Sequence, residues 1–446
     1  MEITDKIILA YDRLMPSQGN FESLKEKASL TKKEVIPFYK RPALVTAFSI
    51  SSVTLIISGC LLGNALISND SLQMLLASPN AKSPISLKGT DANKIAISSL
   101  KLLSPISDGI NNSVVSPIGF SLLSAGYSLV SSNSESAIEQ LGFSNNYEME
   151  LTKLLEVLNW SYHKEGNSEN KADQAKDSSI RSLILYQIID SNDTFSFDED
   201  YQQKIADNHI STLLSEDNYL DEAEQAIKEA IDDDIQVPPF YLKTPGVTAY
   251  SVLTLKDSAE FDSTTFTFNN GQVSKTVDGA NLDDKLLYYE TDIYQAISLP
   301  ISYTDLVFIL PKEDFSLTDI DLASAYEELL AYGKTRRVIG KVPYFSLSSL
   351  NDLTPQTQSL MKDSIPYDKL VISSDASVMP TLDGCLQDVK FTFNKHGVSG
   401  SAITMYNNTS QLGDKPIEFV VDRPFLAIST YENLPLFAMS IINPEI

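Results

Sequence analysis

A charge-free run near the C-terminus constrains this chain of 446 residues more than any other part of its sequence. The seventeen residues from Gly397 to Gly413 contain neither a charged residue nor a proline. Proline would remove a ladder hydrogen bond and a buried charge would be costly, so the run can form a strand as well as an exposed loop. In an extended conformation, one face carries only small side chains: Val398, Gly400, Ala402 and Thr404. We interpret the run as an exposed loop that can switch into a β-sheet.

The segments on both sides of this run have the patterns of strands. In Cys385–Lys395, the apolar residues Val389, Phe391 and Phe393 alternate with polar neighbours, as in a half-buried strand. Downstream, Leu434–Ile442 is almost continuously apolar, which predicts a fully buried strand. The run therefore connects a predicted sheet strand to the C-terminal core of the chain.

Several segments, taken in order, resemble the serpins. They are NSVVSPIGFSLLSAGYSLV (Asn112–Val130), the stretch Lys395–Phe425, its final DRPF (Asp422–Phe425), and LPLFAMSIINP (Leu434–Pro444). The likeness extends over about Asp91 to Ile446. It implies an α+β, serpin-like fold with three β-sheets, about eight to nine helices and an exposed reactive-centre loop. The residue pattern also predicts α+β, because helices concentrate in the first half and strands in the second.

Four predicted elements matter for this fold. Pro117 suits the first turn of a helix that runs to about Val130. Ile180–Ile189 is a buried strand, Leu220–Ile231 is an amphipathic helix, and Val247–Leu255 is the next, central strand. In the serpins, a helix near Leu220–Ile231 lies across the face of the main sheet.

The resemblance assigns roles within the loop. Gly397 is the hinge glycine, and small residues follow it: Val398, Ser399, Gly400, Ser401 and Ala402. Counting forward about fourteen residues from Gly397, as the family's insertion geometry requires, predicts a scissile bond at Gln411–Leu412. Counting back from Pro424 gives a position about two residues later, so the bracket is Ser410–Gly413. A glutamine does not suggest a trypsin-like target.

What the resemblance implies is a suicide-substrate inhibitor of a serine or cysteine endopeptidase, and not an enzyme. The protease would attack the loop and form a covalent acyl complex, and the cleaved loop would then insert into the main sheet. Ser98-Ser99-Leu100-Lys101 fits a Ser-x-x-Lys motif, but its companion Lys-Thr-Gly is absent, so we predict no catalytic residues. Two alternatives stay open: a non-inhibitory serpin-like binding module, and a membrane signalling protein that senses proteolysis.

The sequence departs from the inhibitory pattern at a few positions near the hinge. Lys395 and His396 stand where acidic residues are usual, and Ile403 is larger than the usual alanine. Ala259 replaces a tryptophan that normally packs near the point where the loop enters the sheet. Gln387 lies where many serpins have a histidine that helps to hold the sheet closed, and glutamine can still form hydrogen bonds there.

The N-terminal part of the chain predicts a membrane anchor. Residues 1–41 form a short basic segment, and Pro42–Ile67 contains 26 residues without a charge, whereas a bilayer core needs about 20 in a helix. The basic residues before this span predict a cytoplasmic N-terminus and an extracellular domain at 91–446, with 68–90 as a spacer. The alternative is a lipoprotein anchored at Cys60, because Ile57-Ser58-Gly59-Cys60 resembles the cleavage box of bacterial lipoproteins.

Composition excludes several other functions. A net charge of −25 argues against nucleic-acid binding, which needs clustered Lys and Arg. The two cysteines, Cys60 and Cys385, give no disulfide framework. The three histidines, His163, His209 and His396, have no ligand-like spacing, so we predict no metal site and no cofactor.

Overall fold

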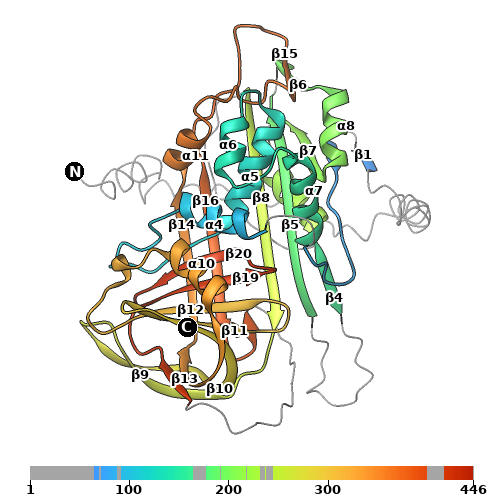
Figure 1. Ribbon diagram of the computed structural model, residues 1–446. Helices are drawn as coiled ribbons and strands as arrows, with labels where there is room; N and C mark the ends of the chain where they lie inside the picture. The colour runs from blue at the N-terminus through green and yellow to red at the C-terminus, as the bar shows by residue number, and fades with distance from the viewer. Residues whose placement is uncertain are drawn as a thin grey trace, which may run out of the picture. The chain divides into compact units, whose positions relative to one another are not determined.

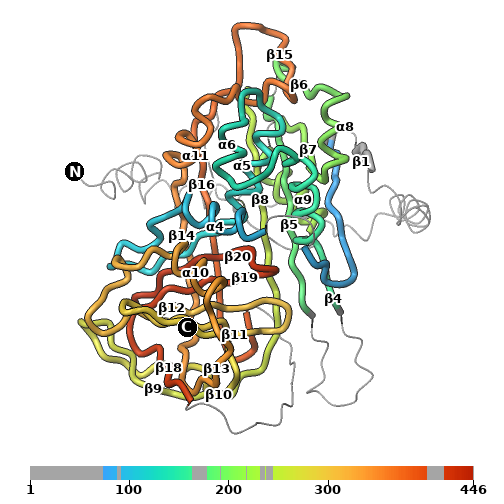
Figure 2. The backbone as a smooth tube through the Cα atoms, viewed as in Figure 1, coloured from blue at the N-terminus to red at the C-terminus, as the bar shows by residue number. Residues whose placement is uncertain are grey.

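The computed structural model describes residues 65–69, 72–87, 92–163, 177–190, 192–216, 218–231, 237, 245–398 and 416–444. Contacts divide the chain into two units, Met1–Leu62 and Gly63–Ile446, and every described residue belongs to the second. Figures 1 and 2 show the described residues in colour. Most of the predicted membrane span and residues 399–415 of the loop lie outside the described residues.

Among the described residues, the first sheet has nine strands, and it contains the predicted hinge residues Gly397 and Val398. Its order is β1 (Ala65–Asn69), β2 (Leu72–Leu76), β7 (Ile210–Ser215), β5 (Asp177–Ile189), β8 (Gly246–Ser258), β17 (Gly397–Val398), β16 (Leu386–Asn394) and β14 (Phe345–Asp352), and β4 (Trp160–His163) pairs with β5. Strands β5 and β7 are parallel, and the other pairs in this sheet are antiparallel.

The second sheet also has nine described strands, and a third has two. The second runs β18 (Ile417–Val420), β13 (Lys334–Pro343), β10 (Ser274–Glu290), β11 (Tyr294–Pro300), β12 (Asp305–Pro311), β19 (Phe425–Tyr431), β20 (Leu434–Ile441) and β3 (Ser113–Val115), with β9 (Ser263–Asn269) paired to β10. The third pairs β15 (Val371–Ser373) with β6 (Phe195–Phe197). After the loop, the chain returns to the second sheet at β18.

The described residues contain eight α-helices and one short 3₁₀ helix, η3 (Leu317–Asp319). The α-helices are α4 (Ala92–Leu102), α5 (Pro117–Val130), α6 (Glu135–Gln140), α7 (Tyr147–Val157), α8 (Glu199–Asp207), α9 (Tyr219–Ile231), α10 (Leu322–Tyr332) and α11 (Thr354–Leu360). Helix α5 contacts both β8 of the first sheet and β20 of the second (Figure 1). It is buried almost throughout, and Ser116 caps its first turn by accepting a hydrogen bond from Gly119 N.

An aromatic cluster joins the two sheets beside the hinge. The ring of Phe393, fully buried on β16, lies 5.4 Å from Tyr344, 5.8 Å from Phe345 and 6.0 Å from Phe308 between centroids. Such pairs stabilise a core beyond the apolar area that they bury. The end of β16 that meets the loop is therefore fixed in the main core.

The three sheets and eight described helices confirm the predicted α+β architecture. The buried strand predicted at Ile180–Ile189 lies within β5, the helix predicted at Leu220–Ile231 is α9, and the central strand predicted at Val247–Leu255 is β8. The boundaries differ by a few residues at most, because strand ends depend on pairing that a single segment does not specify.

The N-terminal boundary differs from the prediction. The segment 68–90, predicted to be a spacer, contributes β2 to the first sheet, where Leu75 pairs opposite Thr212 of β7. Met74 is buried in one cluster with Leu183 of β5 and Ile227 of α9. The last residues of the predicted membrane span, 65–67, belong to strand β1 and not to a helix. Among the helices that the structure describes, none is long and apolar enough to cross a bilayer.

Candidate functional site

The loop hinge is already a strand of the first sheet. Gly397 and Val398 form β17, which pairs antiparallel with Ser258 and Asp257 of β8 on one side. On its other side, β17 pairs antiparallel with Asn394 and Phe393 of β16. The side chain of Val398 is buried, with 1% of its surface exposed. The beginning of the predicted loop therefore lies between two strands of the sheet.

Beyond this two-residue strand, β8 and β16 do not pair with each other. Each has a partner on its outer edge only, β5 for β8 and β14 for β16, and among the described residues β17 alone lies between them. Both strands are antiparallel to β17, so they run parallel to each other. We call the facing edges of Gly246–Lys256 and Leu386–Thr392 the seam. Within the described part of the chain, their backbone groups have no ladder partner on this side, which makes them a template for one more strand.

Glycine is required at position 397 by its backbone conformation and by close packing. Its φ is +103°, a region that residues with a side chain rarely adopt. A Cβ atom there would lie 2.6 Å from both the amide nitrogen of Ala259 and the carbonyl oxygen of Asp257. The backbone of Gly397 therefore lies too close to β8 to leave room for a side chain, which explains why the sequence has glycine at this point.

Gln387 fixes the β16 side of the seam to helix α5. Its Oε1 accepts from the Ser116 amide at 2.9 Å, and its Nε2 donates to the Ser116 carbonyl oxygen at 2.9 Å. On the neighbouring strand, Asn351 Nδ2 donates to the carbonyl oxygen of Val114 at 2.8 Å. Gln387 thus forms hydrogen bonds at this position, as its side chain was predicted to be able to do.

The β8 side of the seam has an incompletely satisfied polar group. Ser251 pairs opposite Ile184 and points to the same side of the sheet, toward α5. Its hydroxyl is buried and has no hydrogen-bond partner within the described part of the chain. Such groups are rare in folded proteins, and each calls for an explanation.

Helix α9 covers the opposite face of the first sheet, as the resemblance implies for the helix near this point. It contacts β5, β7 and β2 through an apolar face: Ala223, Ala226, Ile227 and Ile231. Two buried side chains of β5 hold its ends, because Gln187 Nε2 donates to the Tyr219 carbonyl oxygen and Arg181 Nη2 to that of Ala230, both at 2.8 Å. The helix is therefore anchored over the neighbours of β8.

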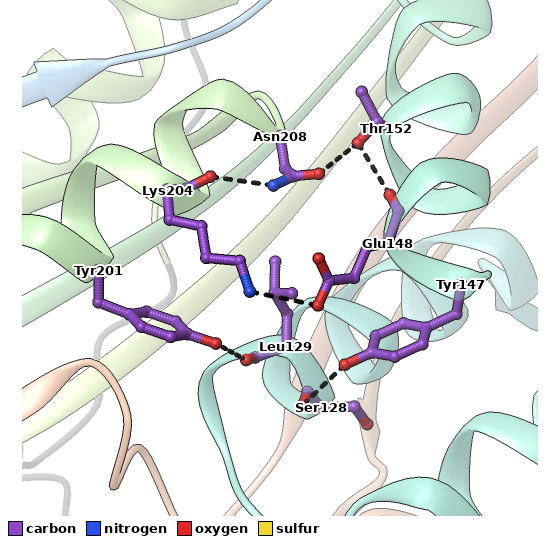
Figure 3. A network of polar contacts seen from close by, with 8 residues as sticks. All are labelled: Ser128, Leu129, Tyr147, Glu148, Thr152, Tyr201, Lys204 and Asn208. Atoms are coloured by element: carbon purple, nitrogen blue, oxygen red, sulfur yellow. Dashed lines mark hydrogen bonds and ion pairs between the residues drawn. The ribbon is translucent and has the colours of Figure 1, made fainter. Parts of the chain in front are cut away.

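A polar network ties α5, α7 and α8 together on the other face (Figure 3). Lys204 Nζ lies 3.3 Å from Glu148 Oε1, and Thr152 Oγ1 donates to Asn208 Oδ1 at 2.7 Å. The Tyr201 hydroxyl donates to the Leu129 carbonyl oxygen at 2.6 Å, and burial raises the pKa of Tyr201 to about 12. These contacts fix α8 and hence the start of β7, away from the seam.

The unusual residues before the hinge have partners that the sequence alone does not reveal. The His396 carbonyl oxygen accepts from the Ala259 amide at 3.2 Å, and that of Lys395 from the Phe261 amide at 3.1 Å. The His396 ring lies 3.3 Å from the Glu260 carboxylate, so the acidic group of this pair is on the β8 side. The acidic partner, Glu260, is visible in the sequence, but only the pairing of β17 with β8 brings the side chains of His396 and Glu260 together.

The structure describes only part of the predicted loop site. Gly397 and Val398 form β17, and their role as a hinge stays a prediction. The remaining predicted hinge residues, Ser399–Ala402, and the bracket Ser410–Gly413 with Gln411 and Leu412 lie outside the described residues. Across the described ranges, no three His, Cys, Asp or Glu side chains are grouped so that they could hold a metal ion.

No family model and no curated protein matches this sequence. Solved structures do match. The native state of tengpin, a thermophilic serpin, has a TM-score of 0.62 at 15% identity and covers 86% of this chain and 100% of its own. Serpin48 of the insect Tenebrio molitor has a TM-score of 0.59 at 17% identity, covering 79% of this chain and 97% of its own. Human thyroxine-binding globulin in complex with thyroxine has a TM-score of 0.60 at 13% identity, covering 80% and 99%.

The similarity to these solved structures lies in the arrangement of sheets and helices, which also positions the residues of the candidate site. The matched structures include two serpins and a globulin complexed with thyroxine, all below 20% identity, so the likeness concerns architecture and not activity. It extends over nearly the full length of each matched chain. Together with the three sheets and the hinge strand, it shows that this chain has the serpin fold.

Proposed function

We propose that this chain inhibits a serine or cysteine endopeptidase as a suicide substrate, through cleavage of its loop and insertion of the cleaved strand into the seam. One observation carries the proposal. Gly397 and Val398 already pair with both β8 and β16, while no other described residue forms a strand between these two edges. The loop thus begins inside the template that its insertion would complete.

The register of β17 sets the length of the inserted strand. Val398 lies opposite Asp257, and in an antiparallel pair each further loop residue lies opposite the preceding residue of β8. Continued in this way, the strand brings Thr409 opposite Gly246, where β8 begins. The proposed scissile bracket, Ser410–Gly413, lies directly beyond this point. The length of β8 therefore supports the bracket independently of the count from the hinge.

The same register distributes the loop side chains between two environments. Val398 points into the core, so alternation directs Gly400, Ala402 and Thr404 toward α5 and Ile403 away from it. The inward side chains are small enough to lie against a helix that is already buried. The larger Ile403 is therefore compatible with insertion.

Thr404 has a specific place in the inserted strand. Continued pairing brings it opposite Ser251 on β8 and opposite Gln387 on β16, with all three side chains on the α5 side. Its hydroxyl would then be a partner for the buried Ser251 hydroxyl, which has none among the described residues. In the proposed mechanism, insertion satisfies a polar group that has no partner among the described residues of the uncleaved chain.

The proposed reaction uses the protease's own chemistry. The nucleophilic serine or cysteine would attack the scissile carbonyl and release the C-terminal segment, leaving the protease acylated. A strand that pairs on both edges gains about 0.5–1.5 kcal/mol net per hydrogen bond, which amounts to on the order of 10 kcal/mol. This free energy would pull the attached protease along the sheet before water completes hydrolysis. The uncleaved chain must then be kinetically trapped.

The test mixes the full-length chain, solubilised in detergent, with a panel of serine and cysteine proteases. An SDS-resistant complex, with a released peptide whose mass locates cleavage within Ser410–Gly413, is the expected result. A protease inactivated beforehand at its nucleophile is the control and should give no complex. Cleavage in the bracket without a complex and without a rise in melting temperature would exclude the proposed mechanism.

A second candidate function, a non-inhibitory binding module, is favoured by a cavity in the second sheet. A cavity of about 250 Å³ lies between β10–β12 and α10, and its lining includes Asp305, Tyr326 and Leu329. One matched structure is described as a complex of thyroxine-binding globulin with thyroxine. Thyroxine is therefore a reasonable first probe, and Leu329→Trp, which would fill the cavity, is the control. Saturable binding that this substitution abolishes, without any protease complex, would favour this candidate.

We also propose that the segment before β1 anchors the chain in a membrane. Residues 42–64 are uncharged and precede β1, and 23 residues suffice for a helix across a bilayer. The proposed orientation has a cytoplasmic N-terminus and an extracellular large domain. The test is protease protection in intact cells, and Cys60→Ser separates this anchor from a lipid attached at Cys60.

If residues 1–41 recover a binding partner from cell extracts, the signalling alternative gains support.

A further inference from the structure

Asp257 is a buried carboxylate at the end of β8, directly opposite Val398. None of its surface is exposed, yet six groups donate hydrogen bonds to it. Oδ2 accepts from the amides of Ser302 (3.1 Å), Tyr303 (2.9 Å) and Thr304 (2.8 Å) and from Thr304 Oγ1 (2.7 Å), and Oδ1 accepts from Ser178 Oγ (3.2 Å) and Ser258 N (2.9 Å). A buried charge with this many donors is held firmly in place.

Apart from the neighbouring Ser258, the donors come from two elements that are distant in the sequence. Ser178 belongs to β5, and Ser302–Thr304 form the turn between β11 and β12 of the second sheet. Ser302 Oγ also donates to the Ser258 carbonyl oxygen at 2.8 Å. The ring of Tyr303 in turn packs edge-on against Trp160 of β4, with 5.1 Å between centroids. Asp257 thus joins the end of β8 to both nine-stranded sheets.

The hinge depends on the position of this strand end. The Cα of Gly397 comes so close to the backbone of Asp257 and Ala259 that a Cβ would lie 2.6 Å from each. The Ala259 and Phe261 amides donate to the carbonyl oxygens of His396 and Lys395. A shift of the end of β8 would therefore break the pairing of the hinge.

We propose that Asp257 is a positioning residue for the loop hinge: its carboxylate holds the end of β8 so that Gly397 and Val398 can pair with β8 and β16 at once. Ala259 occupies the place where the resemblance expects a tryptophan, and the carboxylate provides another means of holding the same strand end. Its consequence for inhibition rests on the proposed function, whereas its consequence for hinge pairing does not.

The variant Asp257→Asn tests this role. Its amide keeps the size of the side chain, but its Nδ2 cannot accept hydrogen bonds, so buried donors of Ser178, Ser258 or the β11–β12 turn lose their acceptor. The matched control is Asp190→Asn at the other end of β5. Asp190 is also buried and accepts from the amides of Asn192 (2.8 Å) and Phe195 (2.6 Å), and none of its hydrogen bonds within the described residues involves Gly397 or Val398. A milder variant, Thr304→Val, removes one donor from the carboxylate and is used if Asp257→Asn does not fold.

The first measurement is hydrogen exchange of the Val398 and Ala259 amides in the full-length chain. We expect roughly tenfold faster exchange in Asp257→Asn than in the wild type, since local opening no longer requires breaking the contacts of the carboxylate. Asp190→Asn should leave exchange at these two amides unchanged. Equal exchange in both variants, at equal global stability, would overturn the proposal.

The second measurement is the number of chains cleaved for each protease complex formed. Asp257→Asn should raise this number severalfold without changing the rate of loop cleavage, and Asp190→Asn should change neither. If hinge exchange rises but no protease forms a complex even with the wild type, the proposed function fails and the positioning role stands. If complexes form and hinge exchange is unaffected by Asp257→Asn, the positioning role fails and the proposed function stands.

Discussion

At the residue scale, Gly397 is the position where the smallest change should have the largest effect on the loop. Gly397→Ala places a Cβ 2.6 Å from two backbone atoms at a φ of +103°, at a cost of about 1–2 kcal/mol or more. We expect the variant to fold, to be cleaved at the wild-type rate and to form far fewer protease complexes. Gly384→Ala is the control, because its Cβ would meet only Thr354 Oγ1 at an ordinary 3.5 Å. Equal complex yields in both variants would contradict this role.

A second prediction at the residue scale concerns pH. Burial, with a smaller contribution from the charge of Asp257, raises the pKa of Asp305 above its ordinary value of 3.8. Because the pKa of Asp305 is higher in the folded state, its protonated form favours the folded state. This contribution to the free energy of unfolding is complete below the pKa of the unfolded state and is lost as the pH rises through the pKa of the folded state. Asp305→Asn stays neutral throughout, so its free energy of unfolding relative to the wild type should increase from pH 3.5 to 7. Urea titrations at several pH values measure this difference, and a flat profile would contradict the prediction.

At the scale of elements, the seam should accept a strand supplied in trans. A synthetic peptide with the sequence of residues 399–409 should bind the intact chain, raise its melting temperature and abolish complex formation. The register provides two matched control peptides. Ala402→Glu places a charge against α5 and should prevent binding, whereas Ile403→Glu points away from α5 and should be tolerated. If both control peptides bind equally well, the proposed register is incorrect.

The elements also show which parts of the structure could be predicted from the sequence. Alternation in Cys385–Lys395 and the apolar face of Leu220–Ile231 are local patterns, and both elements form as predicted. Strand β2 was not predicted, because its pairing partner β7 lies more than a hundred residues away and LQMLL has no strand alternation. The contacts of Asp257 escaped prediction for the same reason, since they connect β5, β8 and the β11–β12 turn only in the folded chain.

At the scale of the whole molecule, cleavage should stabilise the chain. Insertion of residues up to Thr409 would complete the ladder between β8 and β16, and a gain on the order of 10 kcal/mol corresponds to a rise in melting temperature of roughly 10–20 °C for a domain of this size. Calorimetry before and after cleavage within Ser410–Gly413 measures this rise. The chain cut instead in the range 164–176, between β4 and β5, is the control and should show no gain. A cleaved loop without any rise would mean that the seam does not accept it.

The arrangement around Trp160 gives this molecule an optical signal of its own. It is the single tryptophan among 446 residues, and it is fully buried between the rings of Tyr303 and Tyr431. Tyr303 is connected to Asp257 by a backbone hydrogen bond, and Asp257 pairs with the first residues of the loop. Emission from one indole therefore reports on the very strand end where insertion begins. The kinetics of the switch can be followed by stopped-flow fluorescence without attaching any dye.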